Sequence, residues 1–287
     1  MSVLVLENVS YVYSKGTPFE KYALKNIDLS VPKGRTTGLI GHTGSGKSTL
    51  VQLFNGLLRP TEGKILLDGK DIWEDEKKIR DVRFKVGLVM QYPEYQLFEE
   101  TVRKDIAYGP KNIGLPDEEI AERVKKAAYF CGREAELLDK SPFELSGGQK
   151  RRVAIAGVIA MGPELLVLDE PSAGLDPLGR ERILSGIKKY REETDGSVVI
   201  VSHSMEDVAA YCDHLIVMNK GTVYKTGDTK EIFSDPDDLF KVGLDVPQIT
   251  RVTYAVRDGG VNIDPDCITV GEAKREILSF LNKRRDG

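Results

Sequence analysis

The segment Gly41-His42-Thr43-Gly44-Ser45-Gly46-Lys47-Ser48 has the spacing G-x-x-x-x-G-K-[ST]. It follows the apolar stretch Thr36–Ile40, which is typical of a buried strand, and it opens a helical run at Lys47–Leu58. Glycines in such a strand-to-helix turn let successive backbone N–H groups surround a phosphate. The segment therefore predicts a nucleotide site, with Lys47 on the outer phosphates and the Ser48 hydroxyl as a Mg²⁺ ligand.

Two acidic residues end a second apolar stretch, Leu165–Leu168. A carboxylate at the tip of such a strand can hold Mg²⁺ through its water molecules, and we assign this role to Asp169. Glu170 would then lie next to the terminal phosphate and polarise an attacking water.

A further phosphate site is predicted by Leu145-Ser146-Gly147-Gly148-Gln149, which precedes a helical run. The Ser146 hydroxyl, the Gly148 N–H and a helix N-terminus together form an anion site. Because the glycine-rich segment already holds one nucleotide, we expect this second site to face the nucleotide of a partner chain.

The second half of the chain alternates buried strands with helices, a pattern that indicates a parallel, doubly wound sheet. In chain order, the expected elements are helix Gly148–Met161, strand Leu165–Leu168, helix Pro177–Thr194, strand Ser197–Ser202, helix Met205–Cys212 and strand His214–Asn219, and Gly221–Lys225 could add a hairpin strand. An earlier strand is expected at Val86–Met90.

The N-terminal part has a different pattern. Val3–Tyr13 and Tyr22–Val31 alternate in hydrophobicity around the polar segment Ser14–Glu20, which predicts an antiparallel pair. Lys64–Leu67 is a further expected strand, and Thr101–Leu138 is helical and polar.

The composition changes after Thr226. Asp235-Pro236-Asp237-Asp238 and Val246-Pro247 separate short helices, and Gly271–Asn282 predicts a helix with one apolar face. We therefore divide the chain into a domain at 1–226 and a small helical appendage at 227–287. The residues of that apolar face are Ala273, Ile277, Leu278 and Leu281.

Composition excludes several classes. The net charge is −4, with no basic half, which argues against nucleic acid as the main partner. No apolar stretch approaches the ~18 residues of a membrane span, and the N-terminus has no signal-peptide pattern. Cys131, Cys212 and Cys267 are scattered, which favours a reducing compartment such as the cytoplasm.

Taken together, the motifs over roughly residues 3–225 resemble the ABC (ATP-binding cassette) ATPases. The resemblance implies an α/β P-loop NTPase of ABC type. Its parts are a parallel core sheet with helices, an N-terminal antiparallel β subdomain, a helical signature subdomain at about 92–160, and here the appendage. It also implies ATP hydrolysis by a dimer, with ATP and Mg²⁺ as the bound groups.

By position in the family pattern, one further segment and three further residues are assigned roles. Gln91 resembles the Q-loop glutamine, which touches Mg²⁺ and reports to a membrane partner. Ser172–Asp176 resembles the D-loop, which runs along the subunit interface, and His203 resembles the switch histidine at the terminal phosphate. Tyr13 lies where the family stacks an aromatic ring on adenine, although Tyr11 stays an alternative.

The resemblance thus gives three sets of site residues. The expected catalytic residues are Glu170, His203 and Lys47, and the expected Mg²⁺ ligands are Ser48, Gln91 and Asp169. The expected nucleotide-binding residues are Tyr13, Gly41, His42, Thr43, Gly44, Ser45, Gly46, Lys47, Ser48, Thr49, Gln91, Ser146, Gly147, Gly148 and Gln149.

The wording of three segments narrows the family. These segments are Gln91–Val102, with three aromatic residues and a proline, Pro142–Leu145, and Arg151–Val158. They resemble the ATPase subunits of energy-coupling-factor transporters, and among these the second of the two paired types. This resemblance implies the peripheral motor, on the cytoplasmic face of the membrane, of an importer for vitamins, other micronutrients or metal ions.

The same resemblance implies partners. They are a second ATPase subunit (a copy or, better fitting this group, a related chain), a membrane scaffold that contacts Gln91–Phe98, and indirectly a substrate-binding membrane subunit. The appendage is expected to take part in dimerisation. An ATPase of an ordinary binding-protein-dependent ABC importer stays open as the alternative.

Overall fold

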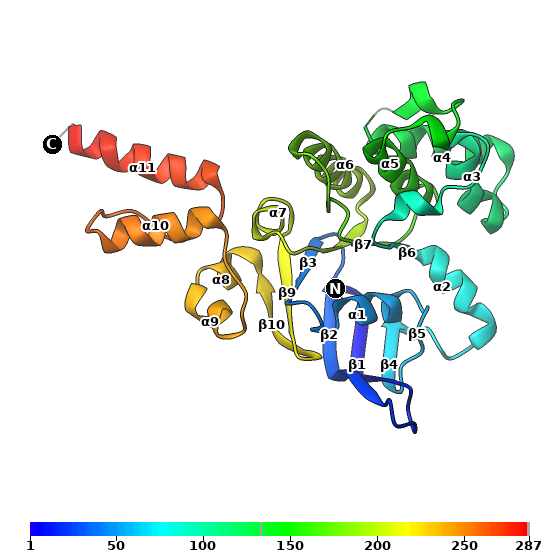
Figure 1. Ribbon diagram of the computed structural model, residues 1–287, viewed down its shortest axis with the longest axis horizontal. Coiled ribbons are helices and arrows are strands. Elements are labelled where there is room, and N and C mark those ends of the chain that lie inside the picture. The colour runs from blue at the N-terminus through cyan, green and yellow to red at the C-terminus, as the bar shows by residue number, and fades with distance from the viewer. Residues whose placement is uncertain (133, 286–287) are drawn as a thin grey trace.

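Two β-sheets form the centre of the protein in this computed structural model, which describes residues 1–132 and 134–285 (Figure 1). The smaller sheet is antiparallel and has the strand order β2-β1-β4-β5. It confirms the predicted N-terminal pair and places the third predicted strand beside β1. Its strands are β1 (Ser2–Tyr13), β2 (Lys21–Pro32), β4 (Glu62–Leu67) and β5 (Lys70–Asp71).

The larger sheet has the strand order β10-β9-β3-β8-β7-β6. Strands β9 to β6 pair in parallel, and β10 pairs antiparallel with β9 as the predicted hairpin strand. The predicted doubly wound sheet is therefore confirmed. Its strands are β3 (Thr36–Ile40), β6 (Val86–Val89), β7 (Leu165–Asp169), β8 (Ser197–Val201), β9 (His214–Asn219) and β10 (Thr222–Asp228).

Helices cover the sheets and form a separate helical subdomain. Helices α3, α4 and α5 pack on one another in that subdomain, at the opposite side of the molecule from the C-terminal helices (Figure 1). The helices up to the end of the core are α1 (Lys47–Phe54), α2 (Ile79–Lys85), α3 (Val102–Ile113), α4 (Asp117–Phe130), α5 (Gly147–Ile159), α6 (Pro177–Thr194) and α7 (Met205–Tyr211). Within the described ranges, the short 3-10 helices are η1 (Glu76–Lys78), η2 (Pro93–Gln96), η3 (Glu134–Leu137) and η4 (Pro142–Glu144).

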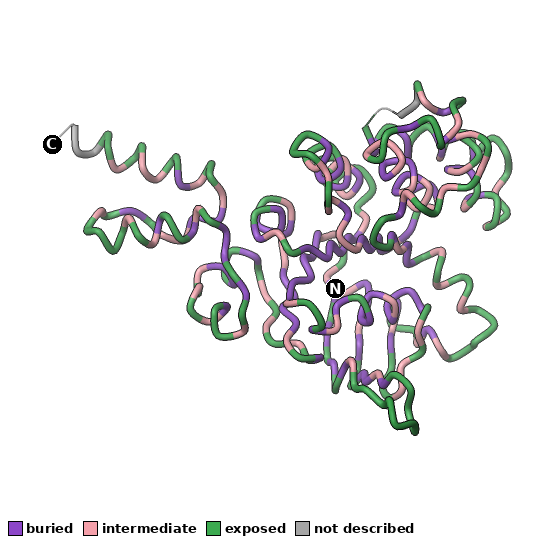
Figure 2. Tube along the Cα trace, in the orientation of Figure 1, coloured by how far each residue is buried: buried purple, intermediate pink, exposed green. Residues whose placement is uncertain are grey.

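The larger sheet separates two hydrophobic cores. Along β7, Leu165 and Val167 face the core shared with α1 and the antiparallel sheet, whereas Leu166 and Leu168 face the core under α5 and α6. This alternation is the period of two that a strand imposes on its side chains. The buried trace in Figure 2 accordingly follows the central strands. The sheet is thus fixed on both faces, which gives the loops at its edge a rigid support.

Helix α1 is shorter than predicted. The sequence pattern extends to Leu58, but the helix ends at Phe54. Gly56 adopts a left-handed backbone (φ 67°), and such a residue ends a helix because its N–H and those that follow turn away from the axis. The N–H groups of Leu57 and Leu58 donate instead to the Gln52 carbonyl.

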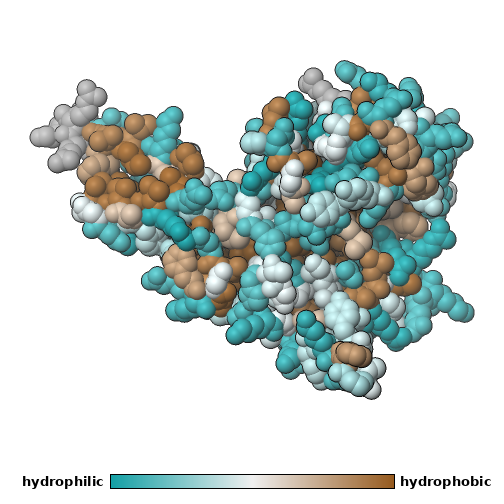
Figure 3. All heavy atoms as spheres, in the orientation of Figure 1, coloured by the Kyte–Doolittle hydropathy of each residue, from teal (hydrophilic) through white to brown (hydrophobic). Residues whose placement is uncertain are grey.

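The C-terminal part is helical, as expected, although strand β10 continues to Asp228, two residues past the expected boundary. Of the helices within 1–132 and 134–285, none has the length and apolar content to cross a membrane. In Figure 3, apolar side chains gather on the surface of this C-terminal part. Its helices are α8 (Thr229–Phe233), α9 (Pro236–Lys241), α10 (Gln248–Asp258) and α11 (Val270–Arg285).

Candidate active site

The predicted catalytic residues meet at one edge of the larger sheet. Four neighbouring parallel strands, β3, β8, β7 and β6, end there, and open α/β sheets bind ligands beyond the carboxyl ends of their strands. A cavity of about 420 Å³ lies at this edge. It is lined by Tyr13, Lys21, Tyr22, Ala23, Thr43, Gly44, Gly46, Lys47, Ser48, Thr49, Gln91, Asp169, Glu170 and His203.

The glycine-rich loop packs too closely for side chains at two positions. A Cβ on Gly41 (φ 156°) would lie 2.5 Å from the Met218 carbonyl oxygen, and one on Gly46 (φ 104°) would lie 2.7 Å from the Leu24 side chain. The buried Lys47 ammonium donates to the Gly41 carbonyl at 2.6 Å. The loop therefore forms a narrow backbone cradle beside the Lys47 ammonium, an arrangement that suits the phosphates of a nucleotide.

Within this loop, three predicted nucleotide-binding residues do not line the cavity: Gly41, His42 and Ser45. The His42 imidazole Nε2 lies 3.1 Å from Asn219 Oδ1, and the Ser45 side chain is fully buried. Neither side chain faces the cavity, so these residues can reach a phosphate only through their backbone N–H groups.

The predicted Mg²⁺ ligands lie together. Ser48, Gln91 and Asp169 all line the same cavity. Burial raises the pKa of Asp169, although Ser48 and the charge of Lys47 partly oppose this. A hydroxyl, an amide and a carboxylate supply the oxygen ligands that Mg²⁺ prefers, so these three residues could hold such an ion.

Glu170 combines an unusual backbone with an unusual pKa. Its φ of 52° is left-handed, which is rare for a residue other than glycine. Burial first, and then the charge of Asp169, raises the pKa of Glu170 to about 7. Its Oε1 is buried without a hydrogen-bond partner among the described residues and lies 3.4 Å from His203 Nε2. This oxygen is an acceptor suited to an attacking water.

His203 lies half-exposed beside Glu170. Burial, followed by the charge of Lys47, lowers the pKa of its imidazole, so the ring is neutral near pH 7. A neutral imidazole can donate one N–H to a phosphate oxygen while it stays next to a carboxylate.

The residues Ser146–Gln149 do not line this cavity. Ser146 is the exposed N-cap of α5, and it forms a reciprocal capping box with Gln149. Nothing lies within 4 Å of a Cβ placed on Gly147. The start of α5 is therefore open to solvent and separate from this chain's own cavity.

Known proteins resemble this chain over most of its length. The model of the ABC transporter family matches residues 24–173. The energy-coupling factor transporter ATP-binding protein EcfA2 of Caldanaerobacter subterraneus is 54% identical over 276 residues, covering 96% of this chain and 96% of that protein. The protein of the same name from Clostridium acetobutylicum is 53% identical over 281 residues, covering 98% of each.

The chain belongs to the energy-coupling factor transporter ATP-binding proteins.

Solved structures support the fold of this ATPase. The structure of cbiO1 from Clostridium perfringens, described as part of the ABC transporter complex cbiONQ, has 39% identity and a TM-score of 0.76 over 89% of this chain and 99% of that chain. A dimeric ATP-binding cassette in a post-hydrolysis state, bound to ADP and Pi, has 29% identity and a TM-score of 0.70 over 79% of this chain and 98% of that chain. The predicted family, the second paired type, the ABC ATPase fold and ATP hydrolysis as the reaction are thereby confirmed.

The far end of the cavity has an aromatic wall. Tyr13 is partly exposed there, and its hydroxyl lies 3.1 Å from Thr49 Oγ1. Tyr11 packs against the core with its ring at 82° to the Tyr13 ring, and it does not line the cavity. This placement favours Tyr13 over Tyr11 as the adenine platform of the ATPase.

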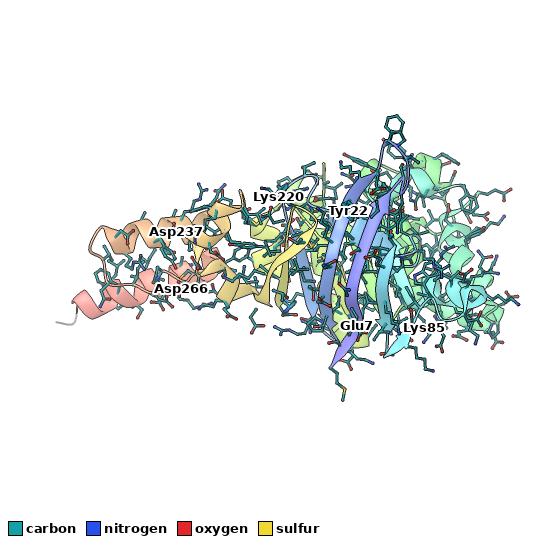
Figure 4. All side chains as sticks on the ribbon, turned by 90° about the horizontal axis from the view of Figure 1, so that it is seen from below. Glu7, Tyr22, Lys85, Lys220, Asp237 and Asp266 are labelled. Carbon is teal, nitrogen blue, oxygen red and sulfur yellow. The ribbon has the colours of Figure 1, made fainter. Side chains whose placement is uncertain are left out.

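Sequence reasoning missed three residues of this wall: Lys21, Tyr22 and Ala23 of β2. Figure 4 shows Tyr22 at the end of that strand, near the turn that holds Lys220. The register could have found them, since Tyr22 pairs with Val12 and Lys21 with Tyr13 across the predicted antiparallel strands. Any platform at Tyr13 brings its cross-strand partners with it.

The raised pKa of Glu170 gives the ATPase a defined pH dependence. A general base works only when deprotonated, so a pKa of about 7 means that kcat/KM falls as the pH drops below 7. We expect about a tenfold loss for each pH unit below that midpoint in rate measurements from pH 5.5 to 9. In the Glu170→Gln variant, the pH dependence of the residual rate should reflect only the protonation of the nucleotide. A wild-type profile identical to that of the variant would contradict the assignment.

Proposed function

We propose that this chain is the ATP-hydrolysing motor subunit of an energy-coupling-factor importer of vitamins, other micronutrients or metal ions. It acts as one half of an ATPase pair at the cytoplasmic face of the membrane. One observation carries this proposal: Lys47 at the start of α1, Glu170 after β7 and His203 after β8 line one cavity in a chain of this family.

Within the cavity, each residue has a distinct task. The cradle after β3 binds the phosphates, and Lys47 places its charge on their outer oxygens. Ser48, Gln91 and Asp169 would hold Mg²⁺, which neutralises charge on the phosphate oxygens when bound. Glu170 accepts the proton of the water that attacks in line.

The cavity is completed by a partner. Ser146 is exposed at the start of α5, and neither it nor Gly148 lines this chain's own cavity, so they suit the terminal phosphate of an ATP held by a second ATPase subunit. Two chains arranged in this way each supply the missing half of the other's site. His203 and the partner's helix N-terminus then enclose the phosphate as the pair closes.

The loop that follows Gln91 is the proposed dock for the membrane scaffold. Tyr92, Tyr95 and Phe98 are exposed, Tyr95 by 85%. Aromatic side chains give a large contact area and lose little side-chain entropy on binding. The Phe98 ring packs edge-on against Tyr108 of α3 at 4.9 Å, so the surface is tied to the helical subdomain.

We expect the double substitution Tyr95→Ser and Phe98→Ser to abolish assembly with the membrane scaffold. ATP hydrolysis by the soluble ATPase pair should stay within about twofold of wild type, because neither side chain lines the catalytic cavity. Co-purification of the membrane subunits and the ATPase rate measure the two effects. Phe19→Ser, in the exposed β1–β2 loop, is the matched control and should assemble. Normal assembly of the double variant would place the dock elsewhere.

The appendage is the proposed contact between ATPase subunits. On α11, Ala273 is buried, but Leu278 and Leu281 are each 47% exposed. Val252 of α10 is 49% exposed. Figure 3 shows this apolar area at the C-terminal part of the molecule. Contiguous exposed apolar surface of this kind marks a protein contact.

Introducing Leu278→Asp and Leu281→Asp together should weaken pairing of the ATPase subunits by at least about tenfold in dissociation constant, since two charges would enter an apolar contact. ATP binding by each single chain should not change. Sedimentation measures pairing, and the exposed Leu57→Asp, just after α1, is the control. Wild-type pairing of the double variant would remove the appendage from the interface.

A further inference from the structure

A buried ion pair joins the loop after Gln91 to the helix that carries Ser146. The Arg151 guanidinium on α5 donates from Nε to Glu94 Oε2 at 2.9 Å and from Nη2 to Glu94 Oε1 at 2.6 Å. The two side chains are only 4% and 14% exposed. Burial would raise the pKa of the Glu94 carboxyl, but the hydrogen bonds and charge of Arg151 outweigh it, so the pKa lies below its ordinary value. The pair is therefore charged and two-pronged.

The same guanidinium holds a third segment. Its Nη1 donates to the backbone carbonyl of Ala173, in the segment Ser172–Asp176 that follows the catalytic strand. The Ala173 N–H in turn donates to the Glu170 carbonyl at 3.2 Å. Two consecutive hydrogen bonds, through Ala173, thus connect the Arg151 side chain to Glu170.

The neighbouring residue is anchored to a different body. The Ser172 hydroxyl donates to Asp207 Oδ2 at 3.1 Å, and Asp207 of α7 is paired with Arg180 of α6 at 2.7 Å. Ser172 is thereby held by the core, and Ala173 by the helical subdomain through α5. A displacement between these two bodies must change the backbone at Ser172–Ala173, next to Glu170.

We propose that Arg151 is a positioning residue for hydrolysis, which holds the backbone after Glu170 in register with the loop after Gln91. The role in hydrolysis stands on the family's ATPase reaction. Its extension, that a membrane partner acts on Glu170 through Glu94 and Arg151, rests on the proposed docking loop. Arginine suits this task because its planar fork can bind a carboxylate with two N–H groups and a carbonyl with a third.

Arg151→Lys tests the role, because lysine keeps the charge but cannot hold Glu94 by two parallel bonds and the Ala173 carbonyl at once. We expect kcat of the ATPase pair to fall about tenfold or more, with KM for ATP within about twofold, since the nucleotide cavity is untouched. Amide exchange at Ala173 and Leu175 should speed up, while exchange in the rest of α5 stays slow. The melting temperature should stay close to that of wild type.

Arg103→Lys is the matched control. Arg103, in the same helical subdomain, also donates from Nε and Nη2 to one carboxylate, Asp139, but that pair is exposed and its side chain touches no catalytic segment in the described structure. Its kcat should equal that of wild type. If Arg151→Lys does not fold, Glu94→Gln takes its place, because it keeps the volume and leaves Arg151 at the Ala173 carbonyl with one orienting bond.

An unchanged kcat in the folded Arg151→Lys, or in Glu94→Gln where the former does not fold, would overturn the proposal. So would a loss of kcat that follows the loss of melting temperature without local exchange at Ala173, since that pattern marks a purely structural pair. These measurements use the ATPase pair alone. A failure of the docking proposal therefore shows in the Tyr95 and Phe98 experiment and leaves this one unaffected.

Discussion

Glu170→Gln should reduce ATP turnover by at least about 100-fold while leaving ATP binding nearly unchanged. The amide has the size of the carboxyl and can keep the local backbone, including the left-handed φ of 52°. It cannot accept a proton from water, however, so the bound nucleotide is not cleaved. In the proposed pair, the partner's helix N-terminus would then stay on an intact terminal phosphate, so the variant pair should accumulate in a closed form with ATP. Steady-state hydrolysis and size-exclusion chromatography with ATP measure both effects.

Glu164→Gln is the control for that result. Glu164 lies just before the same strand β7, at its opposite end, and pairs with Lys85 at 2.8 Å outside the cavity. Hydrolysis by this variant should match that of wild type. A Glu170→Gln enzyme that turns over at the wild-type rate would mean that another group accepts the proton of the water.

Lys47→Ala should weaken nucleotide binding itself. Each charge-assisted hydrogen bond from the ammonium to a phosphate oxygen contributes ~1.5–3 kcal/mol, so losing one predicts a ~10–150-fold weaker affinity. Burial lowers the pKa of Lys47, although the charges of Glu170 and Asp169 partly oppose this. Direct titration with a labelled non-hydrolysable ATP analogue measures the loss without any contribution from turnover.

Lys33→Ala provides the comparison for a non-specific charge effect. Lys33 is an exposed cation after β2, 3.8 Å from Asp68, and it does not line the nucleotide cavity. Its removal should change the affinity by less than about twofold, because exposed pairs are screened. Equal affinities of wild type and Lys47→Ala would show that the cradle binds phosphate through its backbone alone.

Much of the site could be predicted because its residues lie at fixed offsets from strand ends. Gln91, Asp169 and His203 each follow an apolar run, and parallel strands bring those ends together whatever the loops between them do. The cavity that contains Lys47 and Glu170 follows from the same rule. Short apolar segments that end in a polar residue were therefore enough to predict which residues meet at this edge of the sheet.

Contacts across long sequence distances could not be predicted in this way. Glu94 and Arg151 are charged residues in segments that the sequence pattern assigned to other tasks, and no periodicity shows that they bury each other. The end of α1 at Phe54 depends on the left-handed turn at Gly56, which a hydrophobic pattern does not register. The raised pKa of Glu170 likewise depends on burial, which exists only once the two sheets and their loops are assembled.

The strand order has a consequence for synthesis on the ribosome. Strand β3 lies between β8 and β9, whose residues start at Ser197 and His214, so it is made long before either neighbour. At ~5–20 residues per second, the chain waits on the order of 10–40 s between β3 and β9. During that interval the apolar Thr36–Ile40 has no strand to pair with, and the phosphate cradle has no floor at Met218. A nascent chain therefore cannot complete the phosphate cradle, and cannot be stabilised by ATP, until most of it has been made.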